Sequence, residues 1–268
     1  MPGALEGGFV VLDRFKKAKV AEIAGLQSLY ADGRIPEPYS GHRPSFTGSL
    51  KSAGKAPLIA EYKRASPSRG TLNMHTSPEE AAAAYADAGA GAISVLTEEQ
   101  YFKGELSFLE RTAGSGLPLL RKDFIFHPLQ VAQTASTPAS ALLLIVRMLD
   151  ESGLRGLLEE SRRFGLEAVV EIFDAGDLSV AREAGAEIIQ VNNRDLDRLT
   201  VDLNVSKKLI REKKKGEFWI TASGIGLPEQ LECLLASGFD AALVGSSLMQ
   251  GDDPGQALRS LLGRRCYG

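Results

Sequence analysis

Residues 77–98, SPEEAAAAYADAGAGAISVLTE, contain one complete unit of the pattern that decides the fold. Ser77 precedes a run of good helix formers, which is the usual start of an α-helix. Gly89 marks the end of that helix, and the apolar run 92–97 has the length of a buried β-strand. Thr97 and Glu98 stand at the C-terminal end of this run. The stretch therefore predicts a helix that leads directly into a strand.

Eight apolar runs of this kind follow residue 57, and helical patterns separate them. The runs are near-continuous rather than alternating, which is typical of parallel strands covered on both faces. They span residues 58–63, 92–97, 117–124, 140–146, 167–173, 187–193, 217–223 and 240–246. Eight βα units in a chain of 268 residues predict an α/β fold, the (β/α)8 or TIM barrel. A doubly wound open sheet is the alternative, but the GxGxxG turn expected after its first strand is missing.

The segment before the first predicted strand, residues 1–57, has a helical pattern of its own. Apolar residues recur at helical spacing at Leu12, Phe15, Val20, Ile23 and Leu26. The segment is too small to hold a separate core, and a barrel has open ends to cover. We therefore predict a single domain over 1–268, in which residues 1–57 form a helical extension that caps the barrel mouth.

The charge and the apolar runs of the chain argue against nucleic acid and membrane as partners. The formal net charge is −3 and there is no long basic run, so no nucleic-acid-binding surface is expected. No apolar run reaches the ~18 residues of a membrane span. The N-terminal residues contain no cationic segment followed by an apolar core, so no signal peptide is expected. These features predict a cytoplasmic protein that binds neither nucleic acid nor membrane.

Cysteine and histidine are sparse. Cys233 and Cys266 belong to no CxxC pair, which leaves a disulfide framework and a zinc site without support. The histidines, His42, His75 and His127, show no metal-ligand spacing. We therefore expect a protein of the reducing cytosol that carries no metal.

Nearly every predicted strand ends in polar residues on its C-terminal side. They are Glu61, Lys63, Thr97, Glu98, Lys122, Asp123, Arg147, Glu171, Asn192, Arg194, Ser223 and Ser246. In a (β/α)8 barrel these strand ends surround one mouth, where active sites are built. Glu61 and Lys63 are two residues apart, so both side chains can face the barrel axis. Some of these charges must pair, but their number indicates a catalytic cluster.

The last two strand ends share a second feature. They read TASGI (221–225) and VGSSLM (244–249), with Gly and Ser where a strand is expected to pass into a helix. Glycine lets the backbone approach an anion, and helix N-terminal N–H groups add donors. Many barrels bind phosphate at these two loops. The loops therefore predict a phosphorylated ligand.

Together the motifs resemble those of the indole-3-glycerol-phosphate synthases of tryptophan biosynthesis. The similar segments are IAEYKRASPSRG (59–70), LTEEQYFKG (96–104), LPLLRKDFI (117–125), LLLIV (142–146), VVEI (169–172), VNNRDL (191–196), SGI (223–225) and VGSSLM (244–249). The resemblance implies a carboxy-lyase that converts 1-(2-carboxyphenylamino)-1-deoxyribulose 5-phosphate to indole-3-glycerol phosphate, with loss of carbon dioxide and water. It also implies that the reaction needs no metal and no organic cofactor.

The resemblance also implies catalytic roles for five residues. Lys122 is similar to the general acid that protonates the substrate carbonyl during ring closure. Glu171 is similar to the acid/base group of the later dehydration. Glu61 would assist proton transfer and orientation, while Lys63 would hold the carboxylate or phosphate end of the substrate. Asn192 is similar to a polar positioning residue of the sixth strand.

Substrate contacts follow from the same resemblance. Ser66, Arg194, Ser223, Gly224, Gly245 and Ser246 match polar contacts to the substrate and its phosphate. Pro67, Phe102, Phe124, Leu144 and Leu196 match the apolar wall around the anthranilate ring. One position departs, because the family usually has Glu directly before the Ser-Gly of the seventh strand and this chain has Ala222. The mouth is therefore expected to lack one carboxylate.

Two other functions stay open at this point. A different sugar-phosphate isomerase or lyase on a phosphate-binding barrel would keep both Gly-Ser loops, but the set of Lys122, Glu171 and Glu61 argues against it. A non-catalytic barrel that binds a phosphorylated ligand is conceivable because of Ala222. In every case a small phosphorylated molecule is the expected ligand. The sequence also allows a homodimer or an association with other enzymes of tryptophan biosynthesis.

Overall fold

Eight parallel strands close into a barrel in the computed structural model, which describes residues 10–34, 36–52 and 54–263. The barrel strands are β1 (Leu58–Tyr62), β4 (Ala92–Leu96), β5 (Leu119–Ile125), β6 (Ala141–Ile145), β7 (Glu167–Ile172), β8 (Ile188–Asn192), β9 (Phe218–Ala222) and β10 (Ala241–Val244). Each of them overlaps one of the eight predicted runs. The predicted (β/α)8 barrel is therefore confirmed.

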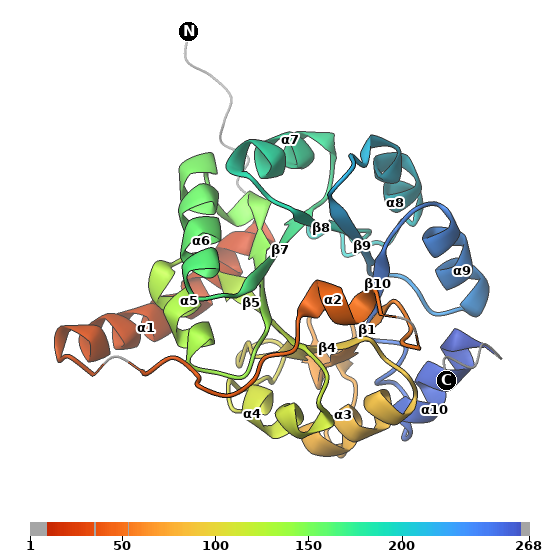
Figure 1. The fold of residues 1–268 in the computed structure, drawn as a ribbon, viewed down its shortest axis with the longest axis horizontal. Coiled ribbons are helices and arrows are strands. Elements are labelled where there is room, and N and C mark those ends of the chain that lie inside the picture. Colours follow the sequence, from red (N-terminus) through yellow and green to blue (C-terminus); the bar gives the residue numbers. More distant parts are fainter. Residues whose placement is uncertain (1–9, 35, 53, 264–268) are drawn as a thin grey trace, which may run out of the picture.

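Helices surround the barrel and connect its strands, as Figure 1 shows from one end. They are α3 (Pro78–Asp87), α4 (Phe108–Thr112), α5 (Pro128–Ala135), α6 (Glu151–Arg163), α7 (Ala175–Ala184), α8 (Asn204–Leu209), α9 (Pro228–Ala236) and α10 (Pro254–Leu262). Three short 3-10 helices, η1 (Ala113–Ser115), η2 (Val146–Met148) and η3 (Ile210–Glu212), extend the connections. A small hairpin of β2 (Ala65–Ser66) and β3 (Gly70–Thr71) follows β1.

Local signals in the sequence set the helix ends. The Ser77 side chain accepts a hydrogen bond from the Glu80 N–H, and the Glu80 carboxylate accepts one from the Ser77 N–H. This capping box satisfies two backbone donors that the first turn of α3 leaves free. At the other end of a helix, Gly185 follows α7 with a φ of 89°, a conformation that glycine adopts at little cost.

Side chains of the barrel strands alternate between two cores. On β6, Leu142 and Leu144 point outward and pack beneath the helices. Ala141, Leu143 and Ile145 point inward and fill the barrel. The period of two residues along a strand produces this alternation. It also decides which residue at each strand end can reach a ligand.

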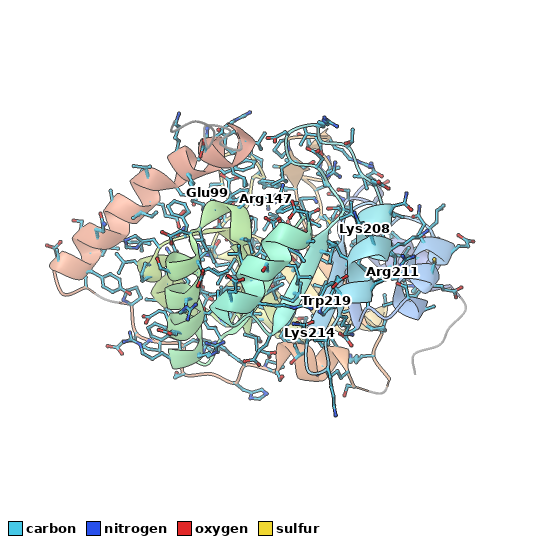
Figure 2. The ribbon with its side chains drawn as sticks, turned by 90° about the horizontal axis from the view of Figure 1, so that it is seen from above. Glu99, Arg147, Lys208, Arg211, Lys214 and Trp219 are labelled. Atoms are coloured by element: carbon cyan, nitrogen blue, oxygen red, sulfur yellow. The ribbon has the colours of Figure 1, made fainter. Side chains whose placement is uncertain are left out.

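The N-terminal extension covers both ends of the barrel. Helix α1 (Val10–Ala31) lies at the mouth, while α2 (Phe46–Leu50) lies across the opposite end, as Figure 2 shows with the barrel upright. The Glu167 carboxylate, at the start of β7, accepts hydrogen bonds from the backbone N–H groups of Phe46 and Thr47. Among the described residues of the extension, α1 provides the expected cap at the mouth, whereas α2 closes the bottom.

Two expectations fall outside the part of the chain that the structure describes. The N-terminal residues that show no signal-peptide pattern include 1–9, and Cys266 lies within 264–268. Cys233 is exposed and has a free thiol. None of the helices in the described ranges combines the length and apolar character of a membrane-spanning segment.

Candidate active site

The C-terminal ends of the barrel strands surround a cavity of about 710 Å³. All five residues with predicted catalytic roles line it: Glu61, Lys63, Lys122, Glu171 and Asn192. They come from four strands that lie far apart in the sequence, β1, β5, β7 and β8. Only the closure of the barrel brings them together, as expected for an active site at a barrel mouth.

Glu61 and Lys63 form an ion pair in this cavity. The Lys63 Nζ lies 2.6 Å from the Glu61 Oε1, and Glu61 is only 3% exposed. Burial alone would raise the pKa of Glu61, but Lys63, Lys122 and Arg194 outweigh it and hold that pKa below its ordinary value. Glu61 is therefore an ionised, oriented carboxylate at neutral pH.

Lys122 lines the cavity from β5. Within the described ranges its ammonium makes no hydrogen bond or ion pair, in contrast to Lys63. A cation that is half-buried and unpaired can donate to an oxygen of a bound ligand without first breaking a contact. This is the arrangement that a general acid for a carbonyl oxygen needs.

Glu171 lines the cavity from β7 and is 2% exposed. Its Oε2 accepts a hydrogen bond of 2.5 Å from the Nε2 of Gln190, on the neighbouring strand β8. Gln190 is fully buried and does not itself line the cavity. A second carboxylate is thus held in place from below the cavity.

Asn192 and Arg194 occupy the end of β8. The Asn192 Oδ1 accepts a hydrogen bond of 3.0 Å from the Arg194 N–H, while the Arg194 guanidinium donates to the Leu199 carbonyl. Burial and the neighbouring Arg69 lower the pKa of Arg194, against the opposing effect of Glu61. Arg69 and Arg194 therefore place cationic groups near one side of the cavity.

The predicted apolar wall is present except for one residue. Pro67, Phe102, Phe124 and Leu196 line the cavity, but Leu144 does not. Leu144 is wrong as a wall residue because it lies on the outward face of β6, where it packs beneath the helices. Its neighbours Leu143 and Ile145 point inward and take that place.

The two Gly-Ser loops lie side by side at the cavity. Ser66, Ser223, Gly224, Gly245 and Ser246 all line it, and the Ser247 Oγ donates to the Ile225 carbonyl across the loops. A Cβ at Gly245 would collide with the Glu61 carboxylate, so only glycine fits there. After β10 the chain forms a turn, and α10 begins only at Pro254, so the predicted direct passage into a helix is wrong for this loop.

Three strand-end polar residues support loops instead of lining the cavity. Arg147 donates to Asp174 and Asp177 after β7, at the mouth end of the barrel in Figure 2. Glu98 is 2% exposed and accepts hydrogen bonds from three backbone N–H groups, those of residues 100–102. It therefore fixes the loop that carries Phe102. Thr97 donates to Asp123 at 2.6 Å.

Helix α1 contributes lining residues that the sequence did not indicate. Leu12 and Phe15 line the cavity, and the Phe15 ring stacks on Phe124 with centroids 4.0 Å apart. The helical spacing of these residues and a cap at the mouth were predicted from the sequence, but the contact of Phe15 with Phe124 was not. Leu143 and Ile145 lie on the opposite face of β6 from Leu144, but every residue of this strand is apolar, so the sequence did not show which face points inward.

The arrangement can carry out acid/base chemistry on an anionic ligand that has an apolar part. Three buried carboxylates, adjacent Gly-Ser loops, an aromatic wall and an ammonium that pairs with no described residue share one cavity. Among the described residues, no group of three or more His, Cys, Asp or Glu side chains is placed to hold a metal ion.

Comparisons with known proteins identify one family. The family model "Indole-3-glycerol phosphate synthase" matches residues 12–261. The indole-3-glycerol phosphate synthase of Aquifex aeolicus is 44% identical over 221 residues, which cover 81% of this chain and 85% of that protein. The one from Chlorobaculum tepidum is 40% identical over 248 residues, 90% of this chain and 96% of that protein.

A solved structure matches at the level of the fold. A mandelate oxidase variant with a monooxide FMN adduct superimposes with a TM-score of 0.59 at 21% identity, over 76% of this chain and 71% of that one. At this identity the likeness concerns the barrel alone.

Proposed function

The chain belongs to the indole-3-glycerol phosphate synthase family, and we propose how its cavity divides the work of that reaction. As a member, it is a carboxy-lyase of tryptophan biosynthesis. It closes the indole ring of 1-(2-carboxyphenylamino)-1-deoxyribulose 5-phosphate and yields indole-3-glycerol phosphate. Ring closure, decarboxylation and dehydration must all occur in one site.

Lys122 is the general acid of ring closure in this proposal. When the aromatic carbon attacks the substrate carbonyl, negative charge develops on the carbonyl oxygen. An ammonium beside that oxygen stabilises the charge and transfers a proton to it. The single observation that carries the proposal is that Lys122 lines the cavity with no hydrogen bond or ion pair to any described residue, while Lys63 is paired with Glu61. Loss of carbon dioxide then restores the aromatic ring.

Glu171 and Glu61 carry out the proton transfers of the dehydration step. The departing hydroxyl needs a proton to leave as water, and a proton must be removed from the ring system. Glu171 is the acid/base group, and Glu61 orients the substrate and assists the transfer. The polar side chain of Asn192 positions the reacting atoms of the substrate. The Glu61 partner, Lys63, holds an anionic end of the substrate.

Binding is divided between the two sides of the cavity. The phosphate lies between the loops after β9 and β10, where Ser223, Gly224, Gly245 and Ser246 present backbone and hydroxyl groups. Arg194 and Ser66 add polar contacts nearby. The anthranilate ring lies against the wall of Pro67, Phe102, Phe124 and Leu196, joined by Leu143 and Ile145 in the place first assigned to Leu144.

The cellular setting of the reaction belongs to the same proposal. We place the enzyme in the cytoplasm, where the free thiol of Cys233 would stay reduced. A homodimer, or an association with other enzymes of tryptophan biosynthesis, is compatible with the exposed helical ring. Neither nucleic acid nor membrane is proposed as a partner.

Mixing the purified chain with the carboxyphenylamino substrate tests the function directly. Indole fluorescence should appear, with one carbon dioxide released per product molecule. An isomerised sugar phosphate without carbon dioxide would mean a different reaction on the same barrel. Tight binding without product would leave only a binding protein.

A further inference from the structure

Gln190 is a buried amide with an unusual environment. It is fully buried on β8, two residues before Asn192 and therefore deeper in the barrel on the same face of the strand. Its Nε2 donates to the Glu171 Oε2 at 2.5 Å, but its Oε1 has no hydrogen-bond partner among the described residues. Leaving a buried amide oxygen unpaired costs free energy, so stability alone does not explain this side chain.

The chemistry of the two groups explains which atom of the amide faces Glu171. An ionised carboxylate can only accept hydrogen bonds, so it requires the Nε2 end of Gln190. A protonated carboxyl group can donate, and a half-turn of the amide would then present the Oε1 as acceptor. A glutamine can thus hold Glu171 in both states, which leucine or methionine cannot do.

We propose that Gln190 is a positioning residue that holds the Glu171 carboxyl group, through its amide, in both protonation states of the dehydration step. The inference rests on the acid/base role proposed above for Glu171. Gln190 fixes one carboxyl oxygen from below the cavity, and the other oxygen stays available to the substrate. It does not touch the substrate and exchanges no proton.

Other charged groups around the cavity also influence how the rate depends on pH. They are Glu61 and Lys63 from β1, Arg69 after it, Lys122 and Asp123 from β5, and Arg194 after β8. The neighbouring strands β6 and β9 face the cavity with apolar side chains, Leu143, Ile145 and Ala222. Gln190 is therefore the one neutral side chain among the described residues that donates a hydrogen bond to Glu171.

The test compares Gln190→Met with the unaltered full-length enzyme across pH. Methionine has a similar length and no hydrogen-bonding amide. The kcat should fall by about tenfold to a hundredfold, the range known for outer-shell partners that orient metal ligands, while KM changes less than about threefold. The pH–rate profile should change as well, because the Glu171 carboxyl group is no longer held by an amide in either protonation state.

Two further variants separate positioning from packing. Ser94→Ala is the matched control, since Ser94 is fully buried on β4 with an unpartnered Oγ and makes no hydrogen bond to Glu171. It should leave kcat and the pH profile unchanged. Gln190→Glu keeps the shape but replaces the amide donor, so it should lower kcat with little change in KM even if the methionine variant folds poorly.

A double mutant identifies the route of the effect. In a Glu171→Gln background, Gln190→Met should cause no further loss, because the group that it positions is already gone. If Glu171→Gln abolishes turnover but Gln190→Met keeps the wild-type rate and pH profile, the inference is overturned and the proposed function stands. If Glu171→Gln itself turns over normally, the role of Glu171 fails, and the inference fails with it.

Discussion

At the scale of single residues, the cavity keeps a buried carboxylate ionised by surrounding it with cations. Lys63, Lys122 and Arg194 together outweigh the burial of Glu61 and hold its pKa below the ordinary value. Ala222 lines the same cavity, where the family usually places another acid. Because Ala222 adds no negative charge, fewer carboxylates interact with the cations of the cavity.

Ala222→Glu should shift the acidic limb of the pH–rate profile to higher pH. A carboxylate at this position is a like charge, which raises the pKa of Glu61, so the active ionised form appears only at higher pH. The expected shift is roughly one pH unit, from the Coulomb energy of charges several ångströms apart near a protein surface.

Measuring kcat against pH for Ala222→Glu and for the uncharged control Ala222→Gln checks this. The control should keep the wild-type limb if charge, and not size, is the cause. Superimposable profiles for all three enzymes would mean that position 222 is electrically remote from the reacting groups.

At the scale of elements, helix α1 is attached to the barrel next to the proposed catalytic residue Lys122. Lys19 of α1 lies 2.7 Å from Asp123, the residue that follows Lys122 on β5. Asp123 is 3% exposed and also pairs with Arg121 at 3.1 Å. Burial would raise the pKa of Asp123, but Arg121 and Lys19 hold it below its usual range. A buried ionic network thus joins the helix at the mouth to the strand that carries Lys122.

Lys19→Met should destabilise the fold by about 3 kcal/mol at neutral pH, because removing one partner leaves a buried charge less compensated. The pKa of Asp123 is lower in the folded than in the unfolded chain, so its contribution to stability is present above the unfolded pKa. That contribution is lost as the pH falls through the folded value. The difference between variant and wild type should therefore shrink below about pH 4.

Urea unfolding at several pH values measures this difference. Lys17→Met, an exposed change on the same helix, is the matched control and should stay within about 0.5 kcal/mol of wild type. A loss for Lys19→Met that is equal at neutral and acid pH would contradict an ionic origin.

The helices and strands could be predicted from the sequence more reliably than the placement of the N-terminal helices or the inward face of a strand. Eight continuous apolar runs and their helix caps were enough for the barrel, because both signals are local. The position of α1 and α2 at opposite ends depends on contacts far apart in the chain, such as Glu167 with Thr47. Leu144 was misplaced because all residues of β6 are apolar, so the pattern itself did not show the inward face. Gln190 is visible as a polar residue in the run 187–193, but its hydrogen bond to Glu171 joins two strands and could not be predicted from the sequence.

At the scale of the whole molecule, the barrel separates stability from chemistry. The end that α2 covers is closed by apolar packing and by the hydrogen bonds of Glu167, while the mouth gathers the unpaired and titratable groups. Such a division is general in this fold, where the strand C-termini carry function and the opposite face carries stability. The central claim is therefore that Lys122, at the mouth, protonates the substrate while the rest of the cavity binds it.

The most direct measurement of that claim is the turnover of Lys122→Met beside its affinity for the product. A positioned general acid contributes ~10²–10⁴ in rate, so kcat should fall at least a hundredfold while the Kd for indole-3-glycerol phosphate stays within about tenfold. Fluorescence titration and a stopped assay give the two values on one preparation. A wild-type kcat, or equal losses in rate and affinity, would contradict the account.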